Sequence, residues 1–496
     1  MAHGVSFFAK EGQYGKRKTR NYYQGVIVVE RLNKIGQIVA KSSKEIKYSR
    51  IGLGFEKLDR ELHNPEMAYD KLAETGAKWI RIQSGWQRTE KEKGVYDFAW
   101  LDSVVDNLVK RGMWPWIDLC YGNALYTDEA AKYFGGVGAP PIHTNEEKQG
   151  WANYCTAVAK RYKGKVSYYE VWNEPDGEWC WKEGPSGIDY AQFVIDTSKA
   201  VKAGDPDAKI IGGSSWNPYT GFLSEALEAG MGAHIDAITF HEYIFDEQRL
   251  TYRVRSLRGL VDMFNPNIKL IQGESGSQSR SDGRGALHKA SWTERKQAKQ
   301  LLRHIMMDLS TEVEFTSYFS AVDMRESVGC DAAIAATLRD FGYFGVLGAE
   351  FGEDGRPTNT YKYKPSFYAL RNITALFSDD VSVASGLPII MAPRISERSG
   401  RMMEDDNHNI TSCCFKRGDG KRAYVYWKPT ALMTTDYEST VTLHLSTFKT
   451  CPHLVDLMDG SIYEIPDSMI EPHELGGYFI VNLPIKDYPM ALTDFC

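Results

Sequence analysis

Cysteine is scarce and scattered in this chain. Eight cysteines are spread over 496 residues, with one adjacent pair, Cys413 and Cys414, and no CxxC motif. Zinc sites and disulfide frameworks need clustered or regularly spaced cysteines, so the sequence predicts neither. Scattered cysteines are typical of a reducing compartment, and we expect a cytoplasmic location. A mature secreted form whose signal has been removed is the alternative.

Long apolar runs and an excess of one charge are also lacking. The first twenty residues, MAHGVSFFAKEGQYGKRKTR, contain no apolar core and no small-residue cleavage site of the signal-peptide kind. No apolar run approaches the roughly 20 residues of a membrane helix. The formal net charge of -6 provides no electrostatic attraction to nucleic acid or to an anionic membrane. We therefore expect neither as a partner, whereas a homo-oligomer stays open.

Histidine motifs for metal binding are absent as well. The eleven histidines form no HExxH motif and no ligand-like cluster, so we expect no metal and no cofactor.

What is present is an ordinary globular composition, with 43% hydrophobic and 25% charged residues. The length is more than a single core needs and predicts two or more domains.

From about residue 50 to 380, short β-prone runs alternate with helical patterns. Eight runs are expected to be strands: 51–55, 78–83, 114–121, 166–172, 209–215, 236–243, 269–274 and 313–322. Several are apolar without polar alternation, as in parallel strands that helices cover. The pattern predicts a (β/α)8 TIM barrel of the α/β class. A doubly wound open sheet is the rival, but "IGLGFE" at 51–56 supplies no GxGxxG motif.

The ends of the chain differ from the middle. After about residue 380, short β runs alternate with turn-rich stretches, which predicts an accessory all-β sandwich. The segment "GVIVVERLNKIGQIVAK" resembles a hairpin that turns near Asn33-Lys34, and we expect it to join this module. The predicted domains are therefore a β-hairpin segment at 1–48, the barrel at 49–380 and the C-terminal sandwich at 381–496. A structural role for the sandwich is favoured over ligand binding.

Two glutamates stand at the ends of predicted barrel strands. Glu174 ends the fourth strand in "EVWNEP" and Glu274 ends the seventh in "IQGESG". Because the carboxyl ends of barrel strands form the active face, both side chains are expected in one mouth. Cleavage of a glycosidic bond with retention of configuration needs such a pair, one acid and one nucleophile about 5–5.5 Å apart. The alternative for any single strand-end glutamate is a solvated loop residue.

These motifs resemble a known family. "EVWNEP", followed by "ITFHEY" and "IQGESG", is similar to the clan A retaining glycoside hydrolases, and most similar to glycoside hydrolase family 39, which includes β-xylosidases. The resemblance extends from about residue 50 to 377. It implies that Glu174 is the acid/base, that Glu274 is the nucleophile and that Asn173 binds the sugar 2-hydroxyl group.

Further polar residues are expected to support this pair. The acid needs a raised pKa, whereas the nucleophile needs donors that keep it ionised. Arg81 on the second strand and Tyr243 at the end of the sixth are candidate donors to Glu274 and candidate substrate contacts. The alternative for Arg81 is a structural ion-pair partner inside the barrel. His241 is expected to contact the substrate or the acid/base, with a satisfied buried histidine as the alternative.

Aromatic residues follow several of the predicted strands and are candidate sugar platforms, because sugars stack their apolar faces on aromatic rings. The resemblance implies a tryptophan on the eighth strand, where the clan usually has one. This chain has Tyr318 and Phe319 there, and Phe319 is our candidate. The other candidates are Trp86, Tyr121, Trp179, Trp181 and Trp216. The alternative is that such rings fill gaps between barrel and helices.

The leading functional hypothesis is a retaining, exo-acting glycoside hydrolase. Its carbohydrate substrate would be a short oligosaccharide or glycoconjugate that ends in a xylose-like pentose or a hexose. An endo-acting glycanase of the same clan is the second hypothesis. A non-catalytic carbohydrate-binding barrel is the third, and it would be expected to lack one of the two carboxylates.

Overall fold

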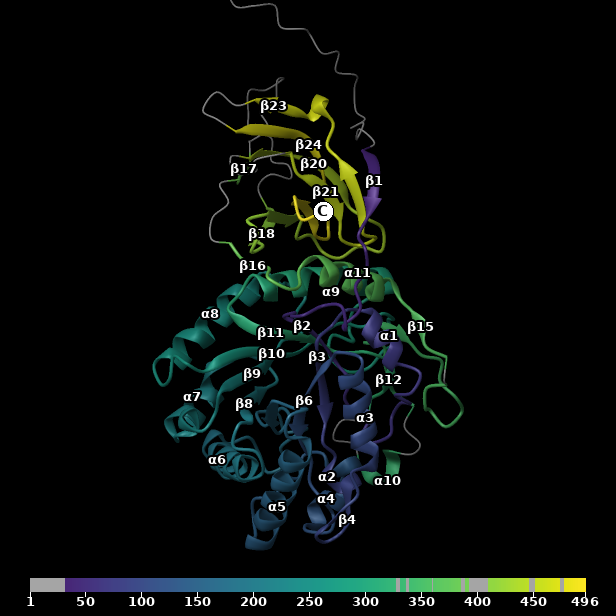
Figure 1. Ribbon diagram of the computed structural model, residues 1–496. Coiled ribbons are helices and arrows are strands. Elements are labelled where there is room, and N and C mark those ends of the chain that lie inside the picture. Colours follow the sequence, from purple (N-terminus) through teal and green to yellow (C-terminus); the bar gives the residue numbers. More distant parts are fainter. Residues whose placement is uncertain are drawn as a thin grey trace, which may run out of the picture.

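The computed structural model describes residues 32–326, 331–335, 339–358, 360–384, 389–391, 409–445, 451–472 and 477–496. Figure 1 shows a barrel surrounded by helices and a β-rich module, which lies beside helices α9 (Glu294–Leu309) and α11 (Pro365–Leu376). In this part of the chain, no helix has the length and apolarity needed to cross a membrane.

Eight parallel strands close into a barrel in the order β2-β3-β6-β7-β8-β9-β10-β11. Each overlaps one of the eight predicted runs, so the (β/α)8 prediction is confirmed and the open doubly wound sheet is excluded. The strands are β2 (Ile51–Gly54), β3 (Trp79–Gln83), β6 (Trp114–Leu119), β7 (Tyr168–Val171), β8 (Lys209–Ser215), β9 (Ala237–His241), β10 (Lys269–Ser275) and β11 (Val313–Tyr318).

Apart from α9, the main barrel helices pack on the outside of the barrel through an apolar face. In α3 (Ala99–Lys110), for example, Leu101, Val104 and Leu108 are buried, and their spacing places them in a single stripe. The other main helices are α1 (Tyr69–Glu74), α5 (Asn145–Tyr162), α6 (Gly187–Gly204), α7 (Thr220–Glu228) and α8 (Arg249–Asp262).

The first barrel helix begins later than its sequence suggests. Asn64 followed by Pro65 resembles a helix start, but α1 begins only at Tyr69. The Asn64 Oδ1 atom accepts a hydrogen bond from the backbone N–H of Glu66 at 3.0 Å, which closes a local turn before the helix. Tyr361 donates its hydroxyl to the Asn64 carbonyl at 2.8 Å and stabilises this turn.

Short helices and strands lie in the loops of the barrel. They are α2 (Trp86–Thr89), β4 (Glu90–Glu92), β5 (Val95–Tyr96), α4 (Asp128–Lys132), β12 (Met324–Arg325), α10 (Ala332–Ala335), β13 (Phe341–Gly342), β14 (Leu347–Gly348) and β15 (Lys362–Tyr363). Short 3-10 turns occur at Phe134–Gly136, Met231–Ala233 and Asp467–Met469.

The barrel interior changes from apolar to polar along the strands. Aromatic rings fill the lower layer, where Trp79 stacks on Phe315 at 4.2 Å between ring centroids and Phe315 contacts Trp116 at 5.4 Å. Two residues further along β3 and β6, the inward positions hold Arg81 and Asp118. The two-residue repeat of a strand thus places charged side chains directly above a packed aromatic floor.

The C-terminal region is all-β, and an N-terminal strand joins it, as predicted. One antiparallel sheet has the order β1-β22-β21-β25-β19-β18-β16 and a second has the order β17-β20-β24-β23. The strands are β1 (Asn33–Gln37), β16 (Ser382–Val383), β17 (Ile389–Met391), β18 (Thr411–Lys416), β19 (Arg422–Trp427), β20 (Glu438–Leu445), β21 (His453–Asp456), β22 (Ser461–Glu464), β23 (Ile470–Pro472), β24 (Tyr478–Lys486) and β25 (Met490–Thr493).

The N-terminal strand corrects one detail of the prediction. Asn33 and Lys34, the expected turn, are the first two residues of β1 and pair with Glu464 and Tyr463 of β22. Pairing with β22 keeps these two residues extended, and the upstream half of the expected hairpin lies outside the described residues. The domain boundaries at 48/49 and 380/381 stay predictions.

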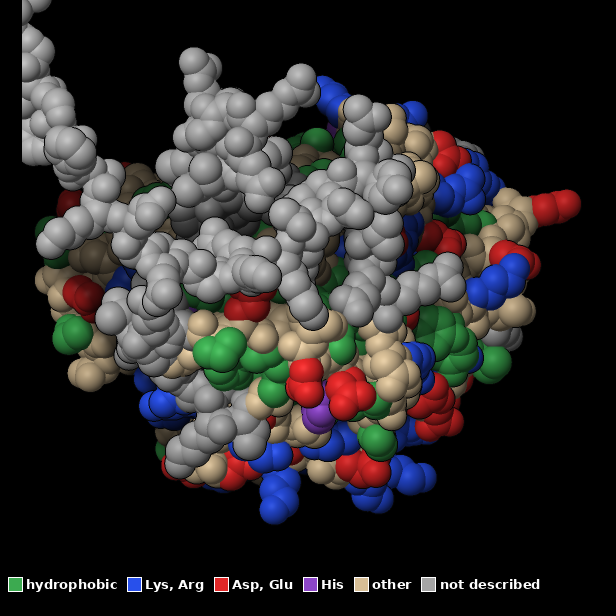
Figure 2. All heavy atoms as spheres, turned by 90° about the horizontal axis from the view of Figure 1, so that it is seen from above, with side chains coloured by type: hydrophobic (Ala, Val, Ile, Leu, Met, Phe, Trp, Pro, Cys, Tyr) green, Lys and Arg blue, Asp and Glu red, His purple; other side chains and the backbone are tan. Residues whose placement is uncertain are grey.

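Viewed from the module end, acidic and basic side chains lie side by side on the visible described surface (Figure 2).

A buried ion pair and a hydrogen bond join the barrel to the module at α9. The Lys299 ammonium group is fully buried and lies 2.8 Å from Asp487 of the module. One turn further on, Arg303 donates to Glu247 at 2.8 Å, and the Trp427 indole donates to the same carboxylate at 3.0 Å. These contacts explain why a helix buried along most of its length carries so many polar residues.

Asp308 near the end of α9 predicts a pH dependence of stability. Its carboxyl group is buried and accepts a hydrogen bond from Thr316 at 2.6 Å. Burial raises the pKa of Asp308 to about 8, whereas an aspartate in the unfolded chain titrates near about 3.9. Between these two pKa values the folded state holds the proton and the unfolded state has lost it. Asp308 therefore makes the free energy of unfolding fall as pH rises through this window, by at most about 1.4 kcal/mol per pH unit.

Asp308→Asn removes this titration and leaves an acceptor for Thr316. We expect the thermal unfolding midpoint of the variant to improve relative to that of the wild type as pH is raised from about 5 to about 8. Differential scanning fluorimetry across this range measures the difference. A difference that stays constant with pH would contradict the assignment.

Candidate active site

The carboxyl ends of the barrel strands open into a cavity of about 860 Å³, a size typical of small-ligand sites. Glu174, which follows β7, and Glu274, in β10, both line this cavity. One carboxylate oxygen of each lies within 4.8 Å of the other and of a ring nitrogen of His241. Two side chains far apart in sequence thus face each other across the barrel mouth.

The turn after β7 delivers Glu174 to the cavity through an unusual backbone. Trp172 and Glu174 have left-handed φ angles of 69° and 48°, which cost a non-glycine residue roughly 1–3 kcal/mol each. The Glu174 N–H donates to the Ser214 carbonyl at 2.8 Å, and the Trp172 indole donates to the Cys180 carbonyl at 2.7 Å. These bonds compensate the strain and hold the carboxylate at the barrel mouth.

Both oxygens of Glu174 have a nitrogen neighbour. His241 Nδ1 lies 2.9 Å from Oε1, and the Trp179 indole N–H donates to Oε2. Burial alone would lower the pKa of His241, but the Glu274 charge and the bond to Glu174 raise it above its ordinary value. The imidazole is therefore suited to hold a proton beside Glu174.

Glu274 is held from both sides by donors. The Tyr243 hydroxyl donates to Oε2 at 2.8 Å, and the Arg81 guanidinium donates to Oε1. Charge-assisted bonds of this kind orient a carboxylate firmly. Arg81 and Tyr243 thus make the two contacts with Glu274 that the sequence suggested.

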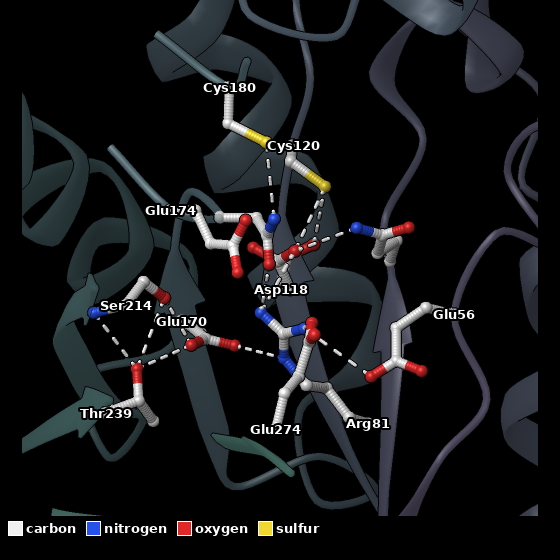
Figure 3. A network of polar contacts seen from close by, with 12 residues as sticks. Glu56, Arg81, Asp118, Cys120, Glu170, Glu174, Cys180, Ser214, Thr239 and Glu274 are labelled. Carbon is white, nitrogen blue, oxygen red and sulfur yellow. Dashed lines mark hydrogen bonds and ion pairs between the residues drawn. The ribbon is translucent and has the colours of Figure 1, made fainter. Parts of the chain in front are cut away.

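Arg81 is surrounded by four acidic side chains (Figure 3). Its nitrogens lie 2.7 Å from Glu170, 3.4 Å from Glu56 and 3.5 Å from Asp118, and it also bonds Glu274. One buried positive charge cannot balance four negative ones at these distances.

Protonation reduces this imbalance. Burial, together with the charge of Glu274, raises the pKa of Glu56 to about 8. Burial raises the pKa of Asp118 to about 7. Glu170 instead accepts hydroxyl bonds from Ser214 and from Thr239, the latter at 2.6 Å. Arg81 makes its shortest contacts with Glu170 and Glu274.

Asn173 stands between this network and the cavity. It lines the cavity, and its Oδ1 atom accepts from Arg81 Nη2 at 2.9 Å. Its amide nitrogen faces the Cys180 sulfur at 3.5 Å, which is a weak partner. Most of the donor capacity of this amide is thus available to a bound molecule.

Of the aromatic side chains predicted to contact a sugar, four line the cavity in addition to Tyr243. They are Tyr121, Trp179, Trp216 and Phe319. Trp179 and Trp216 are 38% and 40% exposed, and their ring centroids lie 5.6 Å apart in an edge-to-face arrangement. The backbone N–H of Trp216 donates to Asp176 at 2.9 Å, which ties the loops after β7 and β8 together. Phe319, and not the buried Tyr318, faces the cavity.

Two tryptophans predicted as sugar contacts lie elsewhere. Trp86 is fully buried, stacks on Tyr126 at 4.9 Å and donates its indole to Glu90. Trp181 is fully buried against Trp172, with ring centroids 6.0 Å apart. Both were expected in the cleft, but the loops that carry them fold back on the barrel, so their rings fill gaps beneath the surface.

Arg81 and His241 make the predicted contacts with the two carboxylates but do not reach the cavity. Both are fully buried and neither lines the cavity. They lie behind the carboxylates and bond to Glu274 and Glu174, so the structure makes them positioning residues in place of direct sugar contacts. Their contact with the two glutamates agrees with the other half of the prediction.

The loop after β2 contributes cavity residues that the sequence reasoning missed: Glu56, Lys57 and Arg60. Lys57 lies 2.9 Å from Glu326, which follows β12 and also lines the cavity. The sequence contained the signal, because "EKLDR" directly follows the first predicted strand, as "NEP" follows the fourth.

Among the described residues, Glu174, His241 and Glu274 form the one group whose donor atoms are close enough to share a metal ion. In the structure the carboxylate of Glu174 accepts a hydrogen bond from Trp179, and that of Glu274 accepts from Tyr243 and Arg81. Carboxylate and imidazole ligands would suit a transition metal, but the guanidinium group beside Glu274 repels a cation.

Comparison with known proteins connects this site to a family. Residues 63–255 match the model of the glycosyl hydrolases family 39. A β-xylosidase of Caldicellulosiruptor saccharolyticus is 28% identical over 193 residues, which cover 35% of this chain and 38% of that protein. Endo-1,4-beta-xylanase A of Phanerodontia chrysosporium is 27% identical over 131 residues, 25% of this chain and 29% of that protein. The chain thus matches less than two fifths of the length of these curated relatives.

Solved structures share the fold over most of the chain. A family 39 glycoside hydrolase from Bacteroides cellulosilyticus WH2 has a TM-score of 0.62 at 17% identity, covering 89% of this chain and 80% of its own. The GH39 enzyme from Xanthomonas axonopodis pv. citri has a TM-score of 0.58 at 16% identity, covering 92% and 95%. The family model thus confirms the resemblance of this chain to glycoside hydrolase family 39 over residues 63–255, and the solved structures share its barrel fold.

Proposed function

We propose that this protein is a retaining O-glycoside hydrolase. The observation that carries the proposal is the pair of facing carboxylates, Glu174 and Glu274, with one oxygen of each within 4.8 Å of the other. Retaining enzymes hold their two carboxyl groups about 5–5.5 Å apart, whereas inverting enzymes leave room for a water between them. The match to family 39 supports the same reaction.

The proposed reaction has two steps. Glu174 protonates the glycosidic oxygen while Glu274 Oε2 or Oε1 attacks the anomeric carbon, so that the C–O bond to the leaving group breaks as the bond to Glu274 forms. Glu174 then takes a proton from water, whose oxygen displaces Glu274 and releases the sugar. Arg81 and Tyr243 orient the nucleophile, and His241 and Trp179 orient the acid/base.

The proposed substrate is a short oligosaccharide or glycoconjugate that ends in a xylose-like pentose or a hexose. The name of the Caldicellulosiruptor relative, a β-xylosidase, supports xylose. The ion pair between Lys57 and Glu326 joins the loop after β2 to a segment that follows β11, and both residues line the cavity. This connection between the two loops supports exo action, because an exo-acting enzyme needs a cavity that is closed at one end. Endo action is the second candidate, and the xylanase relatives support it.

A panel of nitrophenyl monosaccharides tests this proposal. We expect hydrolysis of at least one pentoside or hexoside, and proton NMR of the first product should show the anomer of the substrate. A first product of opposite anomeric configuration would contradict the retaining mechanism. Cleavage of a polymer without cleavage of any monosaccharide derivative would favour the endo candidate, and sugar binding without turnover would favour a non-catalytic barrel. The cytoplasmic location and the homo-oligomer stay predictions, which cell fractionation and light scattering would test.

A further inference from the structure

Glu56 is a buried acidic residue of the cavity that the proposed reaction does not use. It follows β2, lines the cavity and is 1% exposed. Its Oε1 atom lies 3.4 Å from Arg81 Nη1, a long contact, and its Oε2 atom has no hydrogen-bond partner among the described residues. A buried polar atom without a partner destabilises the fold, so such a group calls for an explanation.

The backbone leaves space for this carboxyl group. Gly54 lies two residues before Glu56, and a Cβ atom at Gly54 would come within 2.9 Å of the Glu56 Cδ atom. Any other residue at position 54 would therefore displace the carboxyl group. The strand end thus accommodates the Glu56 side chain beside the cavity at a position where a larger residue would have filled the space.

Glu56 is suited to be a neutral hydrogen-bonding group. It shares Arg81 with three other acids, and the guanidinium makes its shorter contacts with Glu170 and Glu274. The pKa of Glu56, raised to about 8 by burial and by the Glu274 charge, keeps the carboxyl group protonated near neutral pH. A protonated carboxyl group both donates and accepts a hydrogen bond, as does a sugar hydroxyl group.

We propose that Glu56 binds one hydroxyl group of the sugar ring that lies beside Glu274, and that it helps to select the sugar. The inference rests on the proposed function for the identity of the ligand. Glu274 marks where the anomeric carbon would lie, so the neighbouring Glu56 would meet a hydroxyl group of the same ring. A site built to bond a hydroxyl group discriminates against sugars that lack it or carry it in the other orientation.

The test compares a sugar with its monodeoxy analogues, each lacking one hydroxyl group. Glu56→Met removes the hydrogen bond at nearly constant length, and Glu56→Gln keeps a neutral group that donates and accepts. We expect Glu56→Met to lower kcat/KM on the complete glycoside by roughly 10- to 100-fold, and Glu56→Gln to stay within about 5-fold of wild type. The loss in Glu56→Met should vanish on one monodeoxy glycoside and persist on the others.

The ratio of kcat/KM on the complete glycoside to kcat/KM on a monodeoxy glycoside does not depend on the fraction of folded enzyme, because that fraction cancels within one preparation. Asp308→Asn is the matched control. It also replaces a buried acid whose pKa is raised to about 8, but Asp308 does not line the cavity. Its ratios should equal those of the wild type. If Glu56→Met loses activity equally on every monodeoxy glycoside, Glu56 acts only through Arg81 and the inference is overturned.

A binding measurement separates this inference from the proposed reaction. NMR titration of the wild type, Glu56→Met and Glu274→Gln with the free sugar and its monodeoxy forms requires no turnover. Glu56→Met should bind the complete sugar more weakly than the wild type does. One monodeoxy sugar should bind the wild type equally weakly. These two results together support the role of Glu56 even where no glycoside is cleaved. Equal binding to wild type and Glu56→Met overturns it, even where hydrolysis confirms the reaction.

Discussion

Glu274→Gln is expected to lower kcat/KM on a nitrophenyl glycoside by on the order of 10⁴-fold or more, because the variant has no carboxylate to attack the anomeric carbon. The amide has the size of the carboxylate and keeps an oxygen for the Arg81 guanidinium, which donates to Glu274 in the wild type. The folded structure should therefore persist, and steady-state kinetics with thermal unfolding of the same preparation measure both properties.

Glu247→Gln provides a matched control. Glu247 is also a buried glutamate beside an arginine, with Arg303 at 2.8 Å, but it lies at the junction between barrel and module and not in the cavity. We expect this variant to lose thermal stability and to keep its activity on the glycoside. If Glu274→Gln hydrolyses the glycoside at the wild-type rate, Glu274 is not the nucleophile.

Covalent trapping identifies the nucleophile directly. A 2-deoxy-2-fluoro glycoside with a good leaving group should form the glycosyl-enzyme and hydrolyse it slowly, because the fluorine destabilises the positively charged transition state. Peptide mass spectrometry should find the label on Glu274. A label on Glu174 would reverse the two roles.

Glu174→Gln is expected to have an effect that depends on the leaving group. Loss of a general acid costs roughly 10²–10⁴-fold where the leaving group needs protonation. A dinitrophenolate needs little protonation, so the first step on that substrate should be largely spared and the glycosyl-enzyme should accumulate as a burst. The amide retains groups that can bond His241 and Trp179, so the geometry of the site is disturbed little.

Added azide distinguishes the two glutamates. In Glu174→Gln, azide needs no general base and attacks the glycosyl-enzyme, so turnover should recover and the glycosyl azide should have the anomeric configuration of the substrate. In Glu274→Ala, azide can enter only in place of the nucleophile, and any glycosyl azide should be inverted. NMR of the products decides, and an inverted product from Glu174→Gln would contradict its assignment as acid/base.

The barrel could be predicted because its signals are local. Parallel strands covered by helices read as short apolar runs, and each of the eight runs overlaps a barrel strand. Strand ends then indicated where Glu174 and Glu274 would lie, because all carboxyl ends of the strands meet at one mouth. The same rule applied to "FEKLDR" would have found Glu56, which the resemblance to known motifs did not highlight.

The aromatic residues show where local reasoning ends. Trp179 and Trp181 are two residues apart, yet Trp179 lines the cavity and Trp181 is fully buried. No sequence pattern separates them, because the path of the loop depends on the left-handed turn at Trp172 and Glu174 and on its bonds to β8. Exposure of a ring on a loop is decided by what the loop packs against.

The sequence by itself determined the order of strands and helices, the strand ends at which the two glutamates stand and the family that the motifs resemble, since all of these depend on neighbours along the chain. Only the tertiary structure decided that Glu56, Asp118, Glu170 and Glu274 share the single guanidinium group of Arg81. These residues come from five different strands or strand ends, and their charges depend on burial and on distances across the barrel. Protonation at such a site is a property of the closed barrel, because only closure brings the acids together away from water.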